Sequence, residues 1–484
     1  MTDDVTISKI DNTYVQIDAD KGILRELSDY FTFTVPGHTF MPAFKSKMWD
    51  GKIRLLNLRD NSIYYGLISY IFKFCADRDY DCSTNNIDTP NKISEESLQN
   101  FIDSINLSVQ IRKYQSDALL HCINNSRVLL LSPTGSGKSL IIYMMVRYYN
   151  TRSLIIVPTI SLTQQLYSDF KSYDKSWDVD TKCHIIKPGP QKTFDNQVII
   201  TTWQSIYKLP KKYFMDFNFV VGDEAHLFKA KSLTGVMTKL SNAYYRLGTT
   251  GTLDDTQAHK LIIEGLFGPV YNTTSTKDMI DSGYLSTLCI KVLIMEYSKE
   301  TALAVKKMTY HEELEFIVTH SKRNNFIRNL AIDRQGNTLL LFKFVEKHGK
   351  VLYDMITERV AGDRKVFFIH GGVSGEQREE IRTITEAENN AILVASYGTF
   401  STGINIQNLH NIIFASPTKS KIRNMQSIGR GLRKGDSKTE AFLYDIADNL
   451  QSGVKLNYTL QHLKERIKQY SEQDFEYSLY NIKL

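Results

Sequence analysis

The sequence predicts an α/β protein with two parallel sheets, preceded by a small α+β domain. From about residue 127, apolar runs rich in β-branched residues alternate with segments of helical length, a pattern typical of parallel sheets. The runs have few polar interruptions, which favours strands covered by helices on both faces. The first series is Arg127–Leu131, Leu154–Val157, Val198–Thr202, Phe219–Val221 and Arg246–Gly248; the second is Leu339–Phe342, Val366–Ile369, Ile392–Ala395, Ile412–Ala415 and Ala441–Tyr444. Two such series predict two similar doubly wound domains in tandem.

The expected domains are residues 1–100 (small α+β), 101–275 and 276–448 (the two sheet domains) and 449–484 (a helical C-terminal tail). In the first domain, residues 14–17 alternate like a strand, and residues 24–31 and 67–74 have helical spacing. The polar stretches at residues 88–97 and 271–281 are the expected linkers. In the tail, Leu456, Leu460, Leu463 and Ile467 are spaced to share one helix face.

Composition excludes several classes of protein. Five cysteines without a CxxC pair disfavour a disulfide scaffold and a zinc or iron–sulfur site, and indicate a reducing cytoplasm. The first residues, MTDDV, are acidic, and no apolar run approaches the roughly 18 residues that span a membrane. The formal net charge of +6 favours a polyanionic partner only weakly.

Residues 132–139, Ser-Pro-Thr-Gly-Ser-Gly-Lys-Ser, lie between a predicted strand and the helical run 140–148. A phosphate-binding P-loop requires this order of strand, loop and helix. Backbone amides at the helix start would surround phosphate oxygens, the Lys138 ammonium would neutralise the β- and γ-phosphates, and the Ser139 hydroxyl would bind Mg²⁺. The residues expected to bind the nucleotide here are Thr134, Gly135, Ser136, Gly137, Lys138 and Ser139.

Two carboxylates, Asp223 and Glu224, follow the predicted strand that ends at Val221. Ligands bind at the carboxyl ends of strands in open parallel sheets. We expect Asp223 to hold Mg²⁺ through water and Glu224 to orient the attacking water.

The two motifs together resemble motifs I and II of superfamily 2 helicases, which have two RecA-like domains. Residues 111–115, Ile-Arg-Lys-Tyr-Gln, resemble the adenine-recognition segment, so the resemblance implies that Tyr114 stacks on the base and Gln115 reads its edge. Thr159, Thr202 and Trp203 lie in segments similar to the strand-contacting loops of these helicases, and Thr250-Gly-Thr252 resembles coupling motif III.

The second half resembles motifs V and VI of the same superfamily. Residues 396–405 resemble motif V, and the resemblance implies that Gly403 and Asn405 lie near the nucleotide. Residues 426–433, Gln-Ser-Ile-Gly-Arg-Gly-Leu-Arg, supply Arg430 and Arg433 as arginine fingers. Part of this basic helix could instead contact DNA phosphates. The family usually has Arg after the Gln, where this chain has Ser427.

Within the superfamily, residues 36–56 and 475–484 resemble the UvsW helicases of T-even bacteriophages. Their activity implies an ATP- and Mg²⁺-dependent DNA helicase in the cytoplasm of an infected bacterium. It also implies work in recombination, replication and repair: Holliday-junction migration, fork regression and dissociation of R-loops and D-loops. DNA, RNA–DNA hybrids and single-strand-binding or recombination proteins are then the implied partners. An RNA helicase, the motor subunit of a restriction system and an inactive nucleic-acid-binding scaffold are the alternatives.

The N-terminal domain contains the remaining candidate DNA contacts. Lys45, Lys47, Lys52, Arg54 and Arg59 lie within 15 residues that contain one acid, with Phe44, Met48 and Trp49 interleaved. Lysines can neutralise phosphates while an aromatic ring stacks on an unpaired base. Trp49 has two interpretations, a core residue or a DNA contact, and Lys45, Lys47 and Lys52 are expected to contact DNA because lysine is seldom buried.

Overall fold

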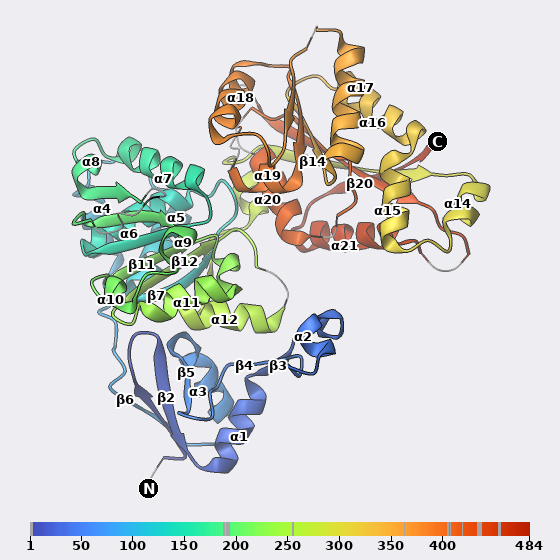
Figure 1. The fold of residues 1–484 in the computed structure, drawn as a ribbon. Coiled ribbons are helices and arrows are strands. Elements are labelled where there is room, and N and C mark those ends of the chain that lie inside the picture. The colour runs from blue at the N-terminus through green and yellow to red at the C-terminus, as the bar shows by residue number, and fades with distance from the viewer. Residues whose placement is uncertain are drawn as a thin grey trace. The chain divides into compact units, whose positions relative to one another are not determined.

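The structure, a computed structural model, describes residues 3–186, 189, 194–253, 256–362, 364–403, 406, 408–418, 420–432, 438–453 and 456–484 (Figure 1). The chain divides into two compact units. The first unit consists of residues 1–132 and 137–273, and the second consists of residues 133–136 and 274–484. The first contains the N-terminal domain and the first RecA-like domain, and the second contains the second RecA-like domain. Among the helices of the described residues, none combines the length and apolarity needed to cross a membrane.

The N-terminal domain is a mixed sheet with helices on one face. Its strand order is β5 (Ser62–Tyr64), β2 (Tyr14–Ala19), β1 (Val5–Lys9) and β6 (Cys82–Asn85), and its helices are α1 (Lys21–Tyr30), the short η2 (Tyr65–Leu67) and α3 (Ile68–Ala76). β1 pairs with β2 in antiparallel and with β6 in parallel orientation. Alternate residues of β1 and β2, such as Ile7 and Val15, are buried against Leu27 and Phe74 of the helices.

A projection extends from this domain between α1 and β5 (Figure 1). Its stem is an antiparallel pair, β3 (Thr32–Thr34) and β4 (Lys52–Arg54). Its end contains the short helices η1 (His38–Phe40) and α2 (Pro42–Lys45). We call residues 32–54 the α2 projection.

The first RecA-like domain is a parallel sheet between two helical layers. Its strand order is β13 (Val270–Asn272), β7 (Arg127–Leu131), β12 (Tyr245–Thr250), β11 (Phe219–Asp223), β8 (Ser153–Val157), β10 (Val198–Thr202) and β9 (Cys183–Ile185). One face packs on α4 (Glu95–Asp103), α5 (Lys113–Asn125), α6 (Lys138–Tyr149), α7 (Ile160–Tyr173) and α8 (Val179–Lys182). The other packs on α9 (Trp203–Ile206), α10 (Lys211–Phe214), η3 (Ala225–Lys229), α11 (Lys231–Lys239) and α12 (Gln257–Phe267).

The second RecA-like domain has the same architecture. Its parallel sheet has the order β16 (Val366–Ile369), β17 (Ile392–Ser396), β15 (Thr338–Phe342), β18 (Asn411–Phe414), β19 (Glu440–Asn449), β14 (Thr287–Glu296) and β20 (Tyr477–Lys483). The core on one face includes α13 (Thr276–Asp281), α18 (Gly375–Ala387), α19 (Tyr397–Gly403), α20 (Lys421–Gly431) and α21 (Tyr458–Glu472). The remaining helices are α14 (Lys299–Val305), α15 (Tyr310–Thr319), α16 (Ser321–Asp333), the π-helix η4 (Val345–Lys350) and α17 (Val351–Val360).

The predicted fold class is confirmed, with corrections at the edges of the sheets. The C-terminal tail contains the expected helix, α21, but residues 477–483 are a strand that pairs with β14. The expected linker 271–281 is also partly regular, because Tyr271 and Asn272 pair with β7 and residues 276–281 form α13. Edge strands and short helices lack the long apolar runs that revealed the central strands.

Candidate functional site

The P-loop has the backbone geometry that phosphate binding requires. Gly135 and Gly137 have φ of +87° and +81°, values that side-chain-bearing residues seldom adopt. Gly137 is the N-cap of α6, so the helix begins at Lys138 with its first amides directed toward the loop. The Lys138 Nζ atom donates to the carbonyl oxygen of Ser132 at 3.0 Å, which holds the ammonium over the loop.

Asp223 lies at the end of β11, two strands away from the P-loop strand in the sheet order. Its Oδ1 atom accepts a hydrogen bond of 2.7 Å from the hydroxyl of Thr249, on the neighbouring strand β12. Burial raises the pKa of the Asp223 carboxyl, the Glu224 carboxylate raises it further, and the Lys138 ammonium opposes both. An attraction between the Asp223 carboxyl and the Lys138 ammonium is what the predicted metal- and phosphate-binding roles of these two residues require.

Glu224 is connected to the segment predicted as motif III. Its φ is +52°, and its Oε2 atom lies 3.3 Å from Nδ1 of His226. The same His226 nitrogen lies 3.0 Å from Oγ1 of Thr250, whose hydroxyl donates to the carbonyl of Thr252 at 2.8 Å. The buried His226 thus connects the Glu224 carboxylate to the end of β12.

The segment predicted to recognise adenine lies at the start of α5. The Oε1 atom of Gln115 accepts the backbone N–H of Arg112 at 2.9 Å and so caps the helix. Gln115 also lies against the P-loop, since a Cβ added to Gly137 would be 2.4 Å from its Nε2 atom. The Tyr114 hydroxyl accepts a hydrogen bond of 2.8 Å from the Arg112 guanidinium. The sequence analysis did not single out Arg112.

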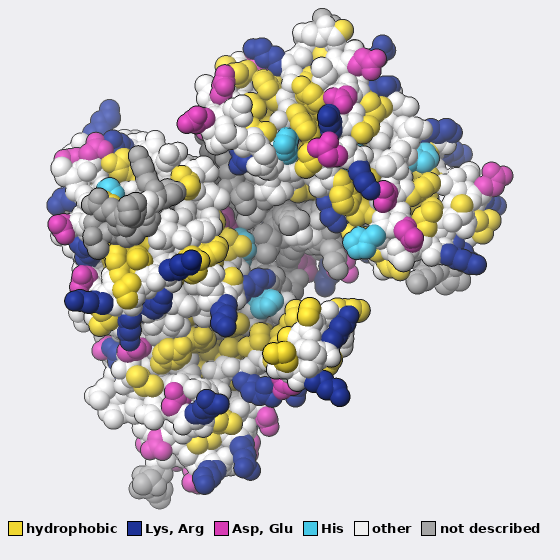
Figure 2. Space-filling model, viewed as in Figure 1, with side chains coloured by type: hydrophobic (Ala, Val, Ile, Leu, Met, Phe, Trp, Pro, Cys, Tyr) yellow, Lys and Arg dark blue, Asp and Glu magenta, His cyan; other side chains and the backbone are white. Residues whose placement is uncertain are grey.

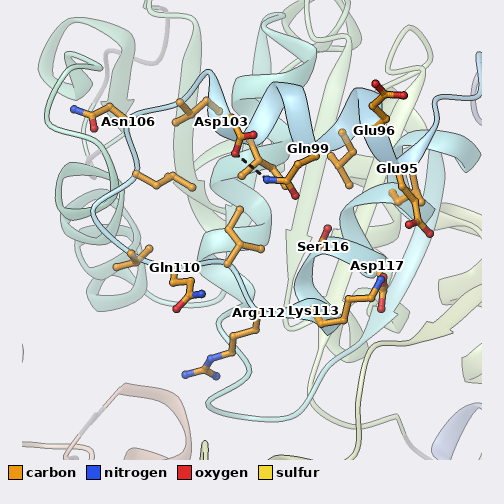
Figure 3. Close-up of a pocket in the computed structure, with 17 residues that line it drawn as sticks. Glu95, Glu96, Gln99, Asp103, Asn106, Gln110, Arg112, Lys113, Ser116 and Asp117 are labelled. Atoms are coloured by element: carbon orange, nitrogen blue, oxygen red, sulfur yellow. Dashed lines mark hydrogen bonds and ion pairs between the residues drawn. The ribbon is translucent and has the colours of Figure 1, made fainter.

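A groove of about 870 Å³ lies beside this segment, between α4, α5 and the loop that joins them (Figure 3). Its rim contains Glu95, Glu96 and Asp103, with Gln99 bonded to Asp103 at 2.8 Å. Arg112 and Lys113 also line the groove, whereas Gln115 does not. The predicted nucleotide contacts Gln115 and residues 134–139 therefore lie outside this groove.

The predicted strand-contacting residues lie at one edge of the first sheet. Thr202 of β10 pairs in register with Val157 of β8, and Thr159 follows two residues later. Thr159 and Thr202 are the N-caps of α7 and α9, which begin at that edge. Trp203 packs partly on the core of the α9 face. The three predicted residues are thus grouped at the carboxyl ends of neighbouring strands.

In the second RecA-like domain, Arg430 lies on α20 with its guanidinium carbon 5.7 Å from the ring centre of Phe400 on α19. Gly403 is the last residue of α19. Asn405 and Arg433 lie outside the described residues.

The α2 projection exposes both basic and apolar side chains, which Figure 2 shows gathered on its surface. Lys45, Lys47 and Lys52 are exposed. Phe40 and Met48 have exposed fractions of 80% and 84%.

The two aromatic residues predicted near these lysines pack within the projection. Trp49 is half-buried, and its indole N–H donates to the carbonyl of Lys52 at 2.8 Å. The Phe44 ring meets the edge of His38 at 4.6 Å between ring centres. Trp49 therefore packs within the projection, and Phe40, which the sequence analysis did not single out, is its exposed aromatic side chain.

Three stretches of the chain match known protein families. Residues 4–85 match the family "DNA helicase UvsW, N-terminal", residues 108–255 match "Type III restriction enzyme, res subunit", and residues 321–435 match "Helicase conserved C-terminal domain".

Similar proteins include the ATP-dependent DNA helicase uvsW of enterobacteria phage T4, which is 34% identical over 99% of this chain and 100% of the relative. The crystal structure of T4 UvsW covers 99% of both chains at 33% identity, with a TM-score of 0.53. A DNA 3'-5' translocase XPB2 of Sulfurisphaera tokodaii is 22% identical over 75% of this chain and 88% of the relative.

The likeness to T4 uvsW extends over the N-terminal domain and both RecA-like domains, in the order that the motifs predicted. The chain therefore belongs to the UvsW family of superfamily 2 helicases and is an ATP-dependent DNA helicase.

Proposed function

We propose that this helicase remodels branched DNA, with the α2 projection contacting the branch point. Its substrates are four-way junctions, forks, D-loops and R-loops with their RNA–DNA hybrids, in phage recombination, replication and repair. Single-strand-binding and recombination proteins of the phage act on the same DNA. The observation that carries the proposal is the combination of exposed lysines and exposed apolar side chains on the α2 projection.

The attachment of the N-terminal domain supports this role. Arg246, 1% exposed at the start of β12, donates to the hydroxyl of Thr13 in the N-terminal domain at 2.9 Å. Arg127 of β7 donates to the carbonyl of Asn12 at 2.8 Å, and the Tyr70 hydroxyl donates to Glu264 at 2.6 Å. These contacts fix the N-terminal domain to the first RecA-like domain, so a motion of that domain carries the α2 projection with it.

The nucleotide chemistry is assigned to the residues at the P-loop edge. Lys138 neutralises the β- and γ-phosphates, and the amides of residues 134–139 surround them. The donor set fits Mg²⁺, which prefers hard oxygen ligands. The Ser139 hydroxyl would bind the ion directly, and the Asp223 carboxylate would hold it through water. Glu224 orients the attacking water, while Tyr114 and Gln115 recognise the adenine.

The second RecA-like domain completes this chemistry. Arg430 and Arg433 act on the charge that develops on the transferring phosphoryl group, and Gly403 and Asn405 contribute to nucleotide binding. Thr159, Thr202 and Trp203 contact the strand along which the protein moves.

A substrate panel tests the proposal. ATP turnover and unwinding are measured on single-stranded DNA, linear duplex, a four-way junction, an R-loop and structured RNA at one ionic strength. We expect the junction and the R-loop to be unwound fastest. Equal or faster unwinding of RNA would favour an RNA helicase, and translocation along duplex without junction preference would favour a restriction-type motor.

A further inference from the structure

The C-terminal segment after residue 435 lies beyond the region matched by the helicase family, yet it is built into the second RecA-like domain. Its helix α21 packs on the same face of the sheet as α20, the helix of Arg430. Leu463 and Tyr470 of α21 belong to the same buried apolar cluster as Ile428 and Leu432. The two helices therefore share one core.

Arg466 fixes the chain where it approaches α20. This side chain is 1% exposed, and its Nη1 atom donates to the carbonyl of Thr418 at 2.9 Å. Its Nε atom donates to Asp445 of β19 at 2.8 Å, and the Tyr470 hydroxyl donates to the same carboxylate at 2.9 Å. The Thr418 carbonyl, three residues before α20, thus accepts a hydrogen bond from the Arg466 guanidinium. The buried ion pair with Asp445 holds that guanidinium in place.

Gln469 contacts α20 directly. Its Oε1 atom accepts a hydrogen bond of 3.1 Å from Nδ2 of Asn424, in the first turns of α20. Asn424 is 0% exposed and Gln469 is 6% exposed, so water competes little for this bond. At the other end of α20, Lys438 donates to the carbonyl of Gly431. The helix is therefore held at both ends.

We infer that α21 positions α20 for hydrolysis, with Gln469 as a positioning residue for Arg430. This inference rests on the proposed role of Arg430 as an arginine finger. Arg430 follows Asn424 by six residues, or about 9 Å of helix at 1.5 Å per residue, so a tilt at Asn424 moves the guanidinium. A displacement of about 1 Å can slow a reaction by about 100-fold, while nucleotide binding at the P-loop is unaffected.

The test replaces Gln469 by Met, which has a similar length and no oxygen to accept the Asn424 hydrogen bond. In the full-length protein, Gln469→Met should lower kcat for DNA-stimulated ATP hydrolysis by about 5- to 100-fold. The dissociation constant for ATP, measured with a fluorescent analogue, should stay within about twofold of that of the parent protein.

Thr459→Val is the matched control. Thr459 is also a buried residue of α21, but its hydroxyl donates to Glu313 of α15 at 2.9 Å and not to α20. We expect a comparable loss of thermal stability with kcat unchanged. If Thr459→Val slowed hydrolysis as much as Gln469→Met, or if Gln469→Met left kcat unchanged, the inference would be overturned.

Arg430→Ala, measured in the same assay, separates this inference from the function on which it rests. If Arg430→Ala slows hydrolysis and Gln469→Met does not, only the positioning role fails. If Arg430→Ala leaves kcat unchanged, the proposed arginine finger is wrong, and a slow Gln469→Met variant would then act through another residue.

Discussion

The hydroxyl oxygen of Ser139 lies 2.7 Å from the hydroxyl oxygen of Tyr173. Tyr173 is the last residue of α7, the helix that begins directly after the predicted strand contact Thr159. A serine hydroxyl has one proton and two lone pairs. If Ser139 donates its proton to Tyr173, its lone pairs remain available to Mg²⁺, and the tyrosine fixes their direction.

Removing the Tyr173 hydroxyl should therefore weaken the metal site. We expect Tyr173→Phe to raise the Mg²⁺ concentration needed for tight nucleotide binding by about tenfold, as loss of a partner that orients a metal ligand often does. The measurement is binding of a fluorescent ADP analogue over a Mg²⁺ titration.

Tyr167→Phe is the control for this prediction. Tyr167 lies on the same helix, but its hydroxyl donates to Asp180 at 2.5 Å. The Tyr167→Phe variant should leave unchanged the Mg²⁺ concentration needed for tight nucleotide binding. An unchanged or lower requirement in Tyr173→Phe would show that the tyrosine does not orient Ser139 toward the metal.

Lys138→Ala and Glu224→Gln should separate binding from turnover. Lys138→Ala removes the cation that faces the phosphates, so we expect it to abolish ATP hydrolysis in a folded protein. Glu224→Gln keeps that cation and Asp223, so it should bind ATP and fail to turn it over. Circular dichroism, nucleotide binding and phosphate release are measured on both. A folded Lys138→Ala variant with DNA-stimulated hydrolysis, or a Glu224→Gln variant unable to bind nucleotide, would contradict these roles.

Asp223→Asn should stabilise the nucleotide-free protein at neutral pH while abolishing turnover. Burial raises the folded pKa of this carboxyl above its usual value near 3.8, so the ionised form is disfavoured by folding. The protonated Asp223 carboxyl contributes to the free energy of unfolding. This contribution is fully present below pH 3.8 and is lost as the pH rises through the higher folded pKa. The neutral amide of Asn does not ionise, so the variant keeps this stability at neutral pH. It also lacks the carboxylate that is proposed to hold Mg²⁺.

Thermal unfolding from pH 4 to pH 8 without nucleotide tests this prediction. The melting temperature of Asp223→Asn should exceed that of the parent protein at pH 8, and the difference should shrink toward pH 4. A variant less stable than the parent at pH 8 would mean that the attraction to Lys138 outweighs the burial of the carboxylate.

The sequence was sufficient to predict structural features that depend on residues adjacent in the chain. The expected strands 127–131, 198–202 and 366–369 have those bounds in the structure, because continuous apolar runs specify buried parallel strands. The loop at residues 132–137 lies between β7 and α6, the order of strand, loop and helix that the sequence predicted. Both patterns lie within short continuous stretches of the sequence.

Contacts between distant segments could not be predicted in this way. Thr249 bonds to Asp223 because β12 is adjacent to β11, and the sequence does not give that order. Tyr173 reaches Ser139 across 34 residues, and Gln469 reaches Asn424 across 45. The strand β14 was not predicted, and the short stem β3–β4 left the α2 projection unrecognised as a separate feature.

The exposed lysines of the α2 projection lead to the last prediction. Replacing Lys45, Lys47 and Lys52 together by Ala should weaken binding to a four-way junction and slow its unwinding, while ATP hydrolysis without DNA stays unchanged. All three side chains are exposed, so their loss should not disturb the fold. Each lysine that contacts a phosphate contributes about one unit to the slope of log affinity against log salt concentration.

Replacing Lys306 and Lys307 by Ala is the matched control, because both are exposed and lie on the second RecA-like domain. Junction affinity is measured by fluorescence anisotropy across a salt titration for the parent protein, the triple variant and this control. The slope of the triple variant should be shallower by up to about three units, whereas the control should follow the parent protein.

Replacing Phe40 and Met48 by Ser should reduce unwinding more than it reduces the slope, because apolar side chains release no counterions on binding. An unchanged slope and unchanged junction affinity in the triple variant would exclude the α2 projection as a DNA contact, and its exposed apolar side chains would then serve another partner.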